Sequence, residues 1–126
     1  MLKRNASQLV SEANNAVETI PVEKGIALVG DDGVVIVDVR ETVERQQGGA
    51  IKGSVHAARG FLEFQADPDH PKYNPAIRQD KRLVLYCATG GRSALAAKTL
   101  VDMGYPNVCH IAGGFGAWTT AGGPTE

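Results

Sequence analysis

The sequence predicts an α/β fold of three layers, in which helices flank a central, mostly parallel sheet of about five strands. Two stretches have the pattern of strands that are covered on both faces: "VVIVDVR" (residues 34–40) is a β-branched run, and "RLVLY" (residues 82–86) is an apolar run. Helical patterns alternate with these strand-like runs along the chain. Strands that are joined through helices pair in parallel with right-handed crossovers, so the alternation favours a sheet between two layers of helices.

The first half of the chain begins with a helical pattern, because Leu9, Val10, Ala13 and Val17 recur at helical spacing behind a cap expected at Ser7. This pattern predicts a helix over 6–20. The elements expected after it are a short helix over 22–30 stopped by Gly30, a strand over 34–40, a polar helix over 41–49 closed by glycine, and a short strand followed by a turn within 51–60.

The second half continues the alternation after the most polar stretch, the loop at 65–75. The expected elements are a strand over 82–86, a helix within 93–105 that ends at Gly104, a short strand over 107–111 and a final helical turn within 113–123. We expect residues 1–17 to form an N-terminal helical extension and residues 18–126 to form one domain. A chain of 126 residues can bury a single core.

Composition excludes several classes of function. The 13 basic and 14 acidic residues balance to a net charge of −1, so no basic surface argues for nucleic acid or for an anionic membrane. Two cysteines, Cys87 and Cys109, are too few for a disulfide framework and favour a reducing compartment. No run approaches membrane-spanning length, and the first 15 residues lack the apolar segment of a signal peptide. We therefore expect a cytoplasmic location.

The segment "CATGGRS" (residues 87–93) is the main candidate for chemistry. Ligands of parallel sheets bind beyond the carboxyl ends of the strands, and both Cys87 and Asp38 stand at such ends. Small residues and glycines leave backbone N–H groups uncovered, and the start of a helix adds unpaired N–H groups and a positive dipole end. Arg92 adds a charge. These surroundings favour a thiolate at Cys87, although a buried cysteine that only fills space is the alternative.

Four motifs in order along the chain resemble those of rhodanese-homology sulfurtransferases. The segment "YCATGGRSALAAKTLVDMGYPNVCHIAGGFGAW" is similar to the active-site half of that family, and "VVIVDVRE" resembles its D-x-R-E strand end. "GGAIKGSVHAARG" resembles its G-x-I-x-G-[AS] segment, and "GGFGAW" its G-G-x-x-x-W signature. Ala50 and Lys52 depart from the family, which often has His and Pro at these positions. The resemblance covers about residues 18–122.

The resemblance implies a single-domain rhodanese fold and a thiosulfate sulfurtransferase activity. Cys87 would attack the outer sulfur of thiosulfate, release sulfite and carry the sulfur as a persulfide until cyanide or a thiol removes it. No metal and no organic cofactor are required. The resemblance and the loop composition together assign substrate binding to Ala88, Thr89, Gly90, Gly91, Arg92 and Arg59, and structural support to Asp38, Arg40 and Ser93.

Several of these residues have alternative readings. Arg92 either orients the anionic donor or pairs with a carboxylate, and Arg59 either faces the pocket mouth or only faces solvent. Asp38 and Arg40 are expected to anchor neighbouring loops through charge-assisted hydrogen bonds. The side chains expected to serve packing or structure rather than chemistry are His56, Cys109, Phe115 and Trp118; Cys109 as a resolving thiol is the less favoured alternative. His70 and His110 show no metal-ligand spacing with the cysteines.

Other classes of function stay open. Cysteine phosphatases and arsenate reductases have a similar loop, but the phosphatase signature leaves five residues between Cys and Arg, whereas Cys87 and Arg92 leave four. A non-catalytic rhodanese module would serve binding or regulation, and a relay would receive its persulfide from another protein. The expected partners are thus a small sulfur donor, a thiophilic acceptor and a protein that carries a persulfide, with the chain acting as a monomer or a homodimer.

Overall fold

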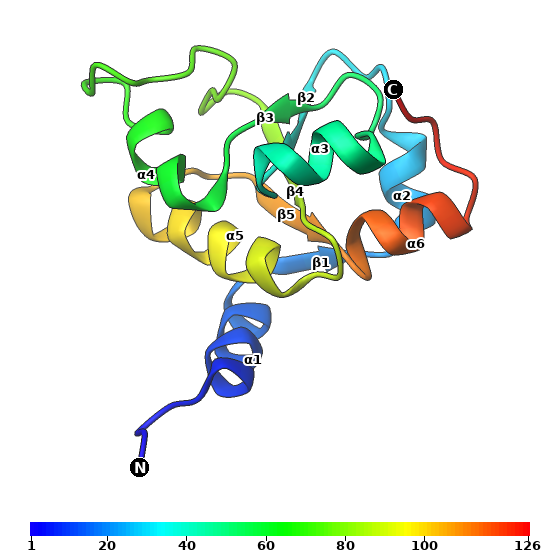
Figure 1. Cartoon of the computed structure of the whole chain (residues 1–126). Helices are drawn as coiled ribbons and strands as arrows, with labels where there is room; N and C mark the ends of the chain where they lie inside the picture. Colours follow the sequence, from blue (N-terminus) through cyan, green and yellow to red (C-terminus); the bar gives the residue numbers. More distant parts are fainter.

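The sheet of the computed structural model, which describes residues 1–126, has five strands that all run parallel. Their order across the sheet is β1-β5-β4-β2-β3, so that β4 lies at the centre (Figure 1). The strands are β1 (Glu18–Ile20), β2 (Val34–Asp38), β3 (Val55–His56), β4 (Arg82–Tyr86) and β5 (Val108–Ile111). The predicted α/β class with about five mostly parallel strands is confirmed.

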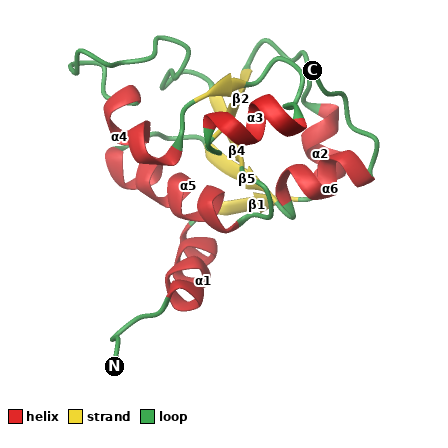
Figure 2. Cartoon of the chain, viewed as in Figure 1, coloured by secondary structure: helices red, strands yellow, loops and turns green.

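Six α-helices and one short 3₁₀ helix surround the sheet (Figure 2). They are α1 (Ala6–Ala16), α2 (Val22–Ala27), α3 (Thr42–Gly48), η1 (Arg59–Phe61), α4 (Leu62–Gln65), α5 (Gly91–Met103) and α6 (Gly114–Thr120). None of them has the length and apolar character that a helix needs to cross a bilayer.

The two faces of the sheet carry separate apolar cores, which explains the continuous apolar runs. Leu83 and Leu85 of β4 pack in one cluster with residues of α4 and α5, whereas Val84 and Tyr86 pack in the other with Trp118 of α6. Successive side chains of a strand point to opposite faces, so a strand with both faces buried needs apolar residues throughout. The three layers are therefore helices, sheet and helices, as predicted.

The first helix is shorter than predicted, and its cap lies elsewhere. α1 ends at Ala16, and residues 18–20 form the edge strand β1, which pairs with β5. Three of the four residues 17–20 are β-branched, and the hydrogen bonds to β5 reward an extended backbone there. The cap is Asn5, whose side chain accepts the N–H of Gln8 in a capping box, rather than Ser7.

α1 lies against the outside of α5 (Figure 1), and its Ala13 is completely buried there. A methyl group at this position lets the two helix backbones approach closely, whereas most of α1 is exposed and projects away from the sheet. The boundary between an extension ending at residue 17 and a domain starting at residue 18 stays a prediction.

Candidate active site

Cys87 is the first residue after the central strand β4, and the loop that follows it leads into α5. The turn depends on Gly90, which has a φ of +114° and serves as the N-cap of α5. Residues other than glycine rarely adopt this left-handed backbone conformation. The loop therefore returns over Cys87 and places the first N–H groups of the 13-residue helix beside its sulfur.

The sulfur of Cys87 receives hydrogen bonds from the backbone. The Gly90 N–H donates to Sγ at 3.1 Å and the Ser93 N–H at 3.4 Å, while Sγ lies 3.6 Å from Ser93 Oγ. Burial alone would raise the pKa of the thiol, because only 1% of the residue is exposed. The hydrogen bonds from Ser93, Gly90 and Thr89 outweigh burial and hold the pKa of Cys87 below its usual value. A lowered pKa enlarges the fraction of the thiol that is present as the nucleophilic thiolate at a given pH.

The start of α6 supports the cysteine loop from behind. The N–H groups of Phe115 and Gly116 donate to the carbonyl oxygens of Cys87 and Ala88 at 2.8 and 3.1 Å. Gly114 approaches so closely that a Cβ atom on it would lie 2.4 Å from the Cys87 carbonyl oxygen. Gly114 is therefore part of the site, a role that the sequence motif alone did not reveal.

Arg92 pairs with a carboxylate at the rim of the loop. Its Nη1 and Nη2 donate to Oε1 and Oε2 of Glu44 on α3 at 2.6 and 3.0 Å. The Arg92 guanidinium lowers the pKa of Glu44 to about 2. Both side chains are about one-third exposed, so the pair faces solvent beside Cys87. Of the two readings of Arg92, the structure contains the carboxylate pair, and Glu44 is a neighbour that sequence reasoning missed.

Asp38 and Arg40 form a buried charged network at the end of β2. Arg40 donates through Nη2 to Asp38 Oδ2 at 2.8 Å, and Tyr86 and Arg45 donate to the same oxygen at 2.7 and 2.9 Å. Burial opposes the charge on Asp38, but these donors lower its pKa. Arg40 also donates to the Gly49 carbonyl and lies 4.4 Å from the centre of the Phe115 ring. The network thus joins the ends of β2 and β4 to α3 and α6.

The other named residues lie apart from the sulfur. Arg59 donates to Glu63 at 3.0 Å and to Thr99 at 3.2 Å, so its guanidinium is turned along α5 and away from the cysteine loop. His56 Nε2 lies 2.6 Å from the Arg40 carbonyl oxygen and fixes the end of β3. Cys109 is buried in the core on the opposite face of the sheet from Cys87.

His110 is a second residue that sequence reasoning missed. Its Nδ1 lies 2.9 Å from Ser93 Oγ, and its Nε2 lies 2.8 Å from Oδ1 of Asn14 on α1. These three residues are distant in the sequence, so no local pattern signals that they meet. They meet because α1 and β5 both lie beside α5.

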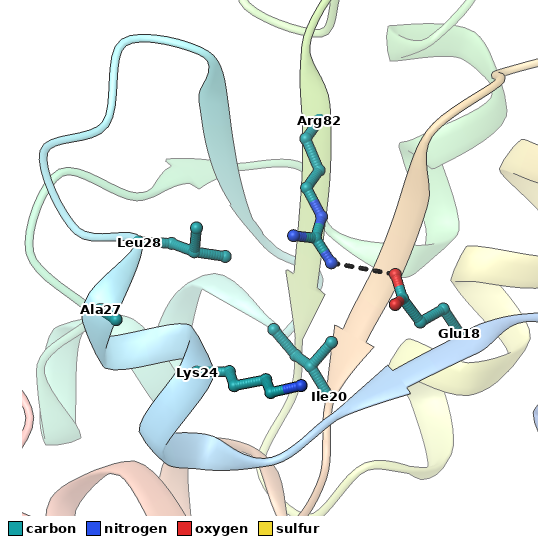
Figure 3. A pocket seen from close by; sticks show the side chains of 6 residues that line it. All are labelled: Glu18, Ile20, Lys24, Ala27, Leu28 and Arg82. Carbon is teal, nitrogen blue, oxygen red and sulfur yellow. Dashed lines mark hydrogen bonds and ion pairs between the residues drawn. The ribbon is translucent and has the colours of Figure 1, made fainter.

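A cavity of the molecule lies away from Cys87. It has a volume of about 360 Å³ and lies between β1, α2 and the beginning of β4 (Figure 3). Its charged wall contains Lys24 and the ion pair between Arg82 and Glu18, at 2.9 Å. Arg82 begins β4, whereas Cys87 follows the end of the same strand. The cavity therefore belongs to another part of the molecule than the thiol.

Comparison with known proteins places this geometry in context. A family model described as a rhodanese-like domain matches residues 22–121. The chain is 31% identical over 110 residues to the thiosulfate sulfurtransferase GlpE of Actinobacillus succinogenes, with 85% of this chain and 88% of that protein covered. It is 32% identical over 89 residues to a tRNA uridine(34) hydroxylase of Agrobacterium fabrum, covering 70% of this chain but only 27% of that longer protein.

A solved structure is more similar still. It is a protein of unknown function from Rhodopseudomonas palustris, described as a possible tyrosine phosphatase, and is 48% identical to this chain. The superposition covers 100% of this chain and 97% of that one with a TM-score of 0.95. The full length of the chain, including α1, thus has a structural counterpart.

Proposed function

Because the chain belongs to the rhodanese-like domain family, we propose that it is a sulfurtransferase that moves a sulfane sulfur from thiosulfate, or a similar donor, through a persulfide on Cys87. The observation that carries the proposal is the set of N–H donors from Gly90 and Ser93 around Sγ, together with the lowered pKa of the thiol. These donors stabilise negative charge on sulfur both before the attack and in the persulfide that follows.

The reaction has two displacement steps. The Cys87 thiolate attacks the outer sulfur of thiosulfate, a new S–S bond forms, and sulfite leaves with the electrons of the broken bond. Cyanide or a thiolate then attacks the outer sulfur of the persulfide, and the Cys87 thiolate returns. Sulfite is a good leaving group, so this scheme needs no dedicated general acid, and its kinetics are of the ping-pong type.

The residues proposed to bind the donor form the loop and its rim. Ala88, Thr89, Gly90 and Gly91 offer a small surface with backbone donors and no charge. Arg92 offers a cation, which Glu44 shares, and an anionic donor would compete with that carboxylate for the guanidinium. Arg59 would have to leave Glu63 and Thr99 to reach the donor, so the structure gives it less support than Arg92.

The decisive experiment is intact-mass spectrometry of the protein after incubation with thiosulfate, polysulfide or a persulfidated protein, each tested separately. We expect a gain of one sulfur atom that cyanide removes and that Cys87→Ala prevents. The matched control is Cys109→Ala, which should still load because Cys109 lies on the other face of the sheet. Loading from the protein donor alone would indicate a relay, and no loading from any donor would favour a binding module.

A phosphatase is the second candidate, because the 48% identical structure carries that description. Against it, only four residues separate Cys87 from Arg92, and the guanidinium is held by Glu44 rather than turned over the sulfur. A shorter loop encloses a single sulfur better than a tetrahedral phosphate. Hydrolysis of a phosphotyrosine ester that depends on Cys87 would overturn the preference for sulfur transfer.

A further inference from the structure

A buried line of hydrogen bonds connects Cys87 to the N-terminal helix. Sγ lies 3.6 Å from Ser93 Oγ, which lies 2.9 Å from His110 Nδ1. On the other side of the ring, Nε2 lies 2.8 Å from Asn14 Oδ1 and 3.1 Å from Thr19 Oγ1. The line therefore runs through α5 and β5 and ends on α1 and β1, at side chains that are exposed to solvent.

The Asn14 oxygen determines the direction of every proton in this line. A carbonyl oxygen only accepts, so His110 Nε2 carries the hydrogen and Nδ1 is left as an acceptor. The Ser93 hydroxyl can donate to the Gly90 carbonyl at 3.2 Å or to His110 Nδ1 at 2.9 Å, and the Gly90 carbonyl already accepts the Ala94 N–H. With the hydroxyl donating to Nδ1, its lone pairs accept the Cys87 thiol. The thiol, the hydroxyl and the ring thus form a directed line from an acid to a base.

The surroundings of His110 keep the ring neutral when the thiol is protonated. The ring is 2% exposed, and burial lowers its pKa. The groups that face it are Asn14 on α1, Thr19 on β1 and Ser93 on α5, and its neighbour across the sheet in β4 is Leu85. None of these carries a charge, so the nearest titratable group along the line is the Cys87 thiol.

We propose that His110 accepts the Cys87 proton through the Ser93 hydroxyl, and that Asn14 of the N-terminal helix holds the ring in the tautomer this requires. The S–H bond breaks as the proton moves to Ser93 Oγ, and the hydroxyl proton moves to His110 Nδ1. The products are a thiolate and an imidazolium, with no change in net charge. His110 and Asn14 act through Ser93 and are therefore positioning residues for the nucleophile.

Every polar hydrogen of the line is satisfied both before and after the transfer. Before it, Cys87 donates to Ser93, Ser93 to His110 and His110 to Asn14. After it, the new Ser93 hydroxyl donates to the thiolate, Nδ1–H of His110 donates to Ser93, and Nε2–H still donates to Asn14. Two fully satisfied arrangements in one buried network are what a reversible proton transfer needs. The nucleophile, base and orienting group follow the logic of Cys–His–Asn sites, with a hydroxyl inserted.

The inference gives α1 a role that the family match does not assign, since the match begins at residue 22 and Asn14 precedes it. It deepens the proposed sulfur transfer but is tested without a sulfur donor. The test is the rate at which iodoacetamide, which is uncharged, alkylates Cys87 as a function of pH, read by mass spectrometry with Cys87→Ala as the blank. Failure of the sulfurtransferase proposal would leave this profile unchanged.

His110→Gln should slow alkylation about tenfold near pH 6.5, where the thiolate–imidazolium pair supplies the nucleophile, and leave it within about twofold near pH 9.5, where the thiolate forms without the ring. Asn14→Leu should slow the reaction in the same pH range, because the imidazolium loses an acceptor. Asn14→Asp should preserve the rate or raise it, since a carboxylate stabilises the imidazolium. The control is Asn15→Leu, an exposed neighbour on the same helix whose side chain takes no part in the line, and this variant should match the parent protein.

Equal slowing at both pH values would indicate a structural role only and would overturn the proposal, as would no slowing at either. An unchanged alkylation rate in Asn14→Leu would show that α1 takes no part in the proton transfer. Should His110→Gln not fold, the ring ¹⁵N shifts of the parent protein decide. We expect the Nε2–H tautomer, and an imidazolium that forms together with the thiolate and is missing in Cys87→Ser. A ring that stays neutral beside the thiolate would refute the transfer.

Discussion

At the scale of single residues, the buried charge of Asp38 stabilises the network at the carboxyl ends of the strands. Its side chain is fully buried, and it neutralises Arg40, whose side chain is only 4% exposed. Removing one member of a buried ion pair leaves the other charge unpaired in a medium that solvates it poorly. The residues that fix the site therefore include some that never touch a substrate.

Asp38→Asn should lower the free energy of unfolding by about 3–5 kcal/mol, because Arg40 loses its counter-ion and Tyr86 loses a charged acceptor. Urea unfolding followed by circular dichroism measures the change. The matched control is Asp80→Asn, which breaks the exposed pair with Arg78 and should leave stability unchanged. A loss in Asp38→Asn no larger than in the control would show that the network is not acting as a buried ion pair.

Arg92 and Glu44 give a second residue-scale prediction, on the binding of an anionic donor. Arg92→Gln should raise KM for thiosulfate about tenfold, since the cation is lost and the Glu44 carboxylate is left beside an anionic substrate. Glu44→Gln should lower KM, because the guanidinium becomes free. Steady-state kinetics with a cyanide acceptor give both values, and kcat should change little in either variant. The same change of KM in both variants would contradict the competition between donor and carboxylate.

At the scale of elements, the close contact between α6 and the cysteine loop explains why a glycine directly precedes Phe115. Gly114 has a φ of +58° and leaves no room for a Cβ atom beside the Cys87 carbonyl. Gly122, at a φ of +75°, has nothing within 4 Å of the position of such an atom. Gly114 and Gly122 both have a positive φ, but only Gly114 lies close to the backbone of another segment.

Gly114→Ala should therefore cost more stability than Gly122→Ala. Both substitutions introduce left-handed strain of about 1–2 kcal/mol. Gly114→Ala adds a clash worth a further 1–3 kcal/mol or so, and the loop must move to relieve it. We also expect slower alkylation of Cys87 in Gly114→Ala alone, because the N–H donors move with the loop. Chemical denaturation and the alkylation assay test this, and equal effects of the two substitutions would disprove the role of the contact.

Elements whose signal is local were predictable, and elements that depend on partners were not. Residues 82–93 carry the strand, the glycine turn and the helix start in one continuous stretch, so the position of Cys87 at a strand end followed from the sequence. The edge strand β1 has only three residues, and its residues continue the helical spacing of α1; pairing with β5 decides its conformation. The four-residue helix α4 likewise has no periodicity long enough to detect.

At the scale of the whole molecule, the site is assembled from elements that are far apart in the chain. β4 and α5 supply the thiol and its donors, α6 supports the loop, and α3 holds Arg92 through Glu44. α1 and β5 complete the line from Cys87 to solvent. Contacts of this kind depend on tertiary packing, so neither Glu44 as the partner of Arg92 nor the meeting of Asn14 with His110 could be derived from spacing.

The charged pairs between these elements make the stability of the folded protein depend on pH. The pKa of Glu44 falls from 4.5 in the unfolded chain to about 2 in the folded protein, and the pKa of Asp38 is also lowered. A carboxyl group with a lowered pKa binds its proton more readily in the unfolded state. Its contribution is complete above about pH 4.5 and is lost as the pH falls towards 2. The folded protein should therefore lose stability across this range.

Glu44→Gln should isolate the contribution of the Glu44–Arg92 pair to this dependence of stability on pH. Near pH 7 it should destabilise the protein by about 1 kcal/mol, a modest value because solvent screens a pair that is one-third exposed. The difference between the variant and the parent should shrink as the pH falls below 4.5 and become small near pH 2, where Glu44 is about half protonated in the folded protein. It should vanish at lower pH, where Glu44 is protonated in both states. Melting temperatures by circular dichroism at intervals between these pH values measure it, with Glu63→Gln, in an exposed pair with Arg59, as the control. A difference that stays constant or grows in acid would mean that Glu44 acts through packing rather than through its charge.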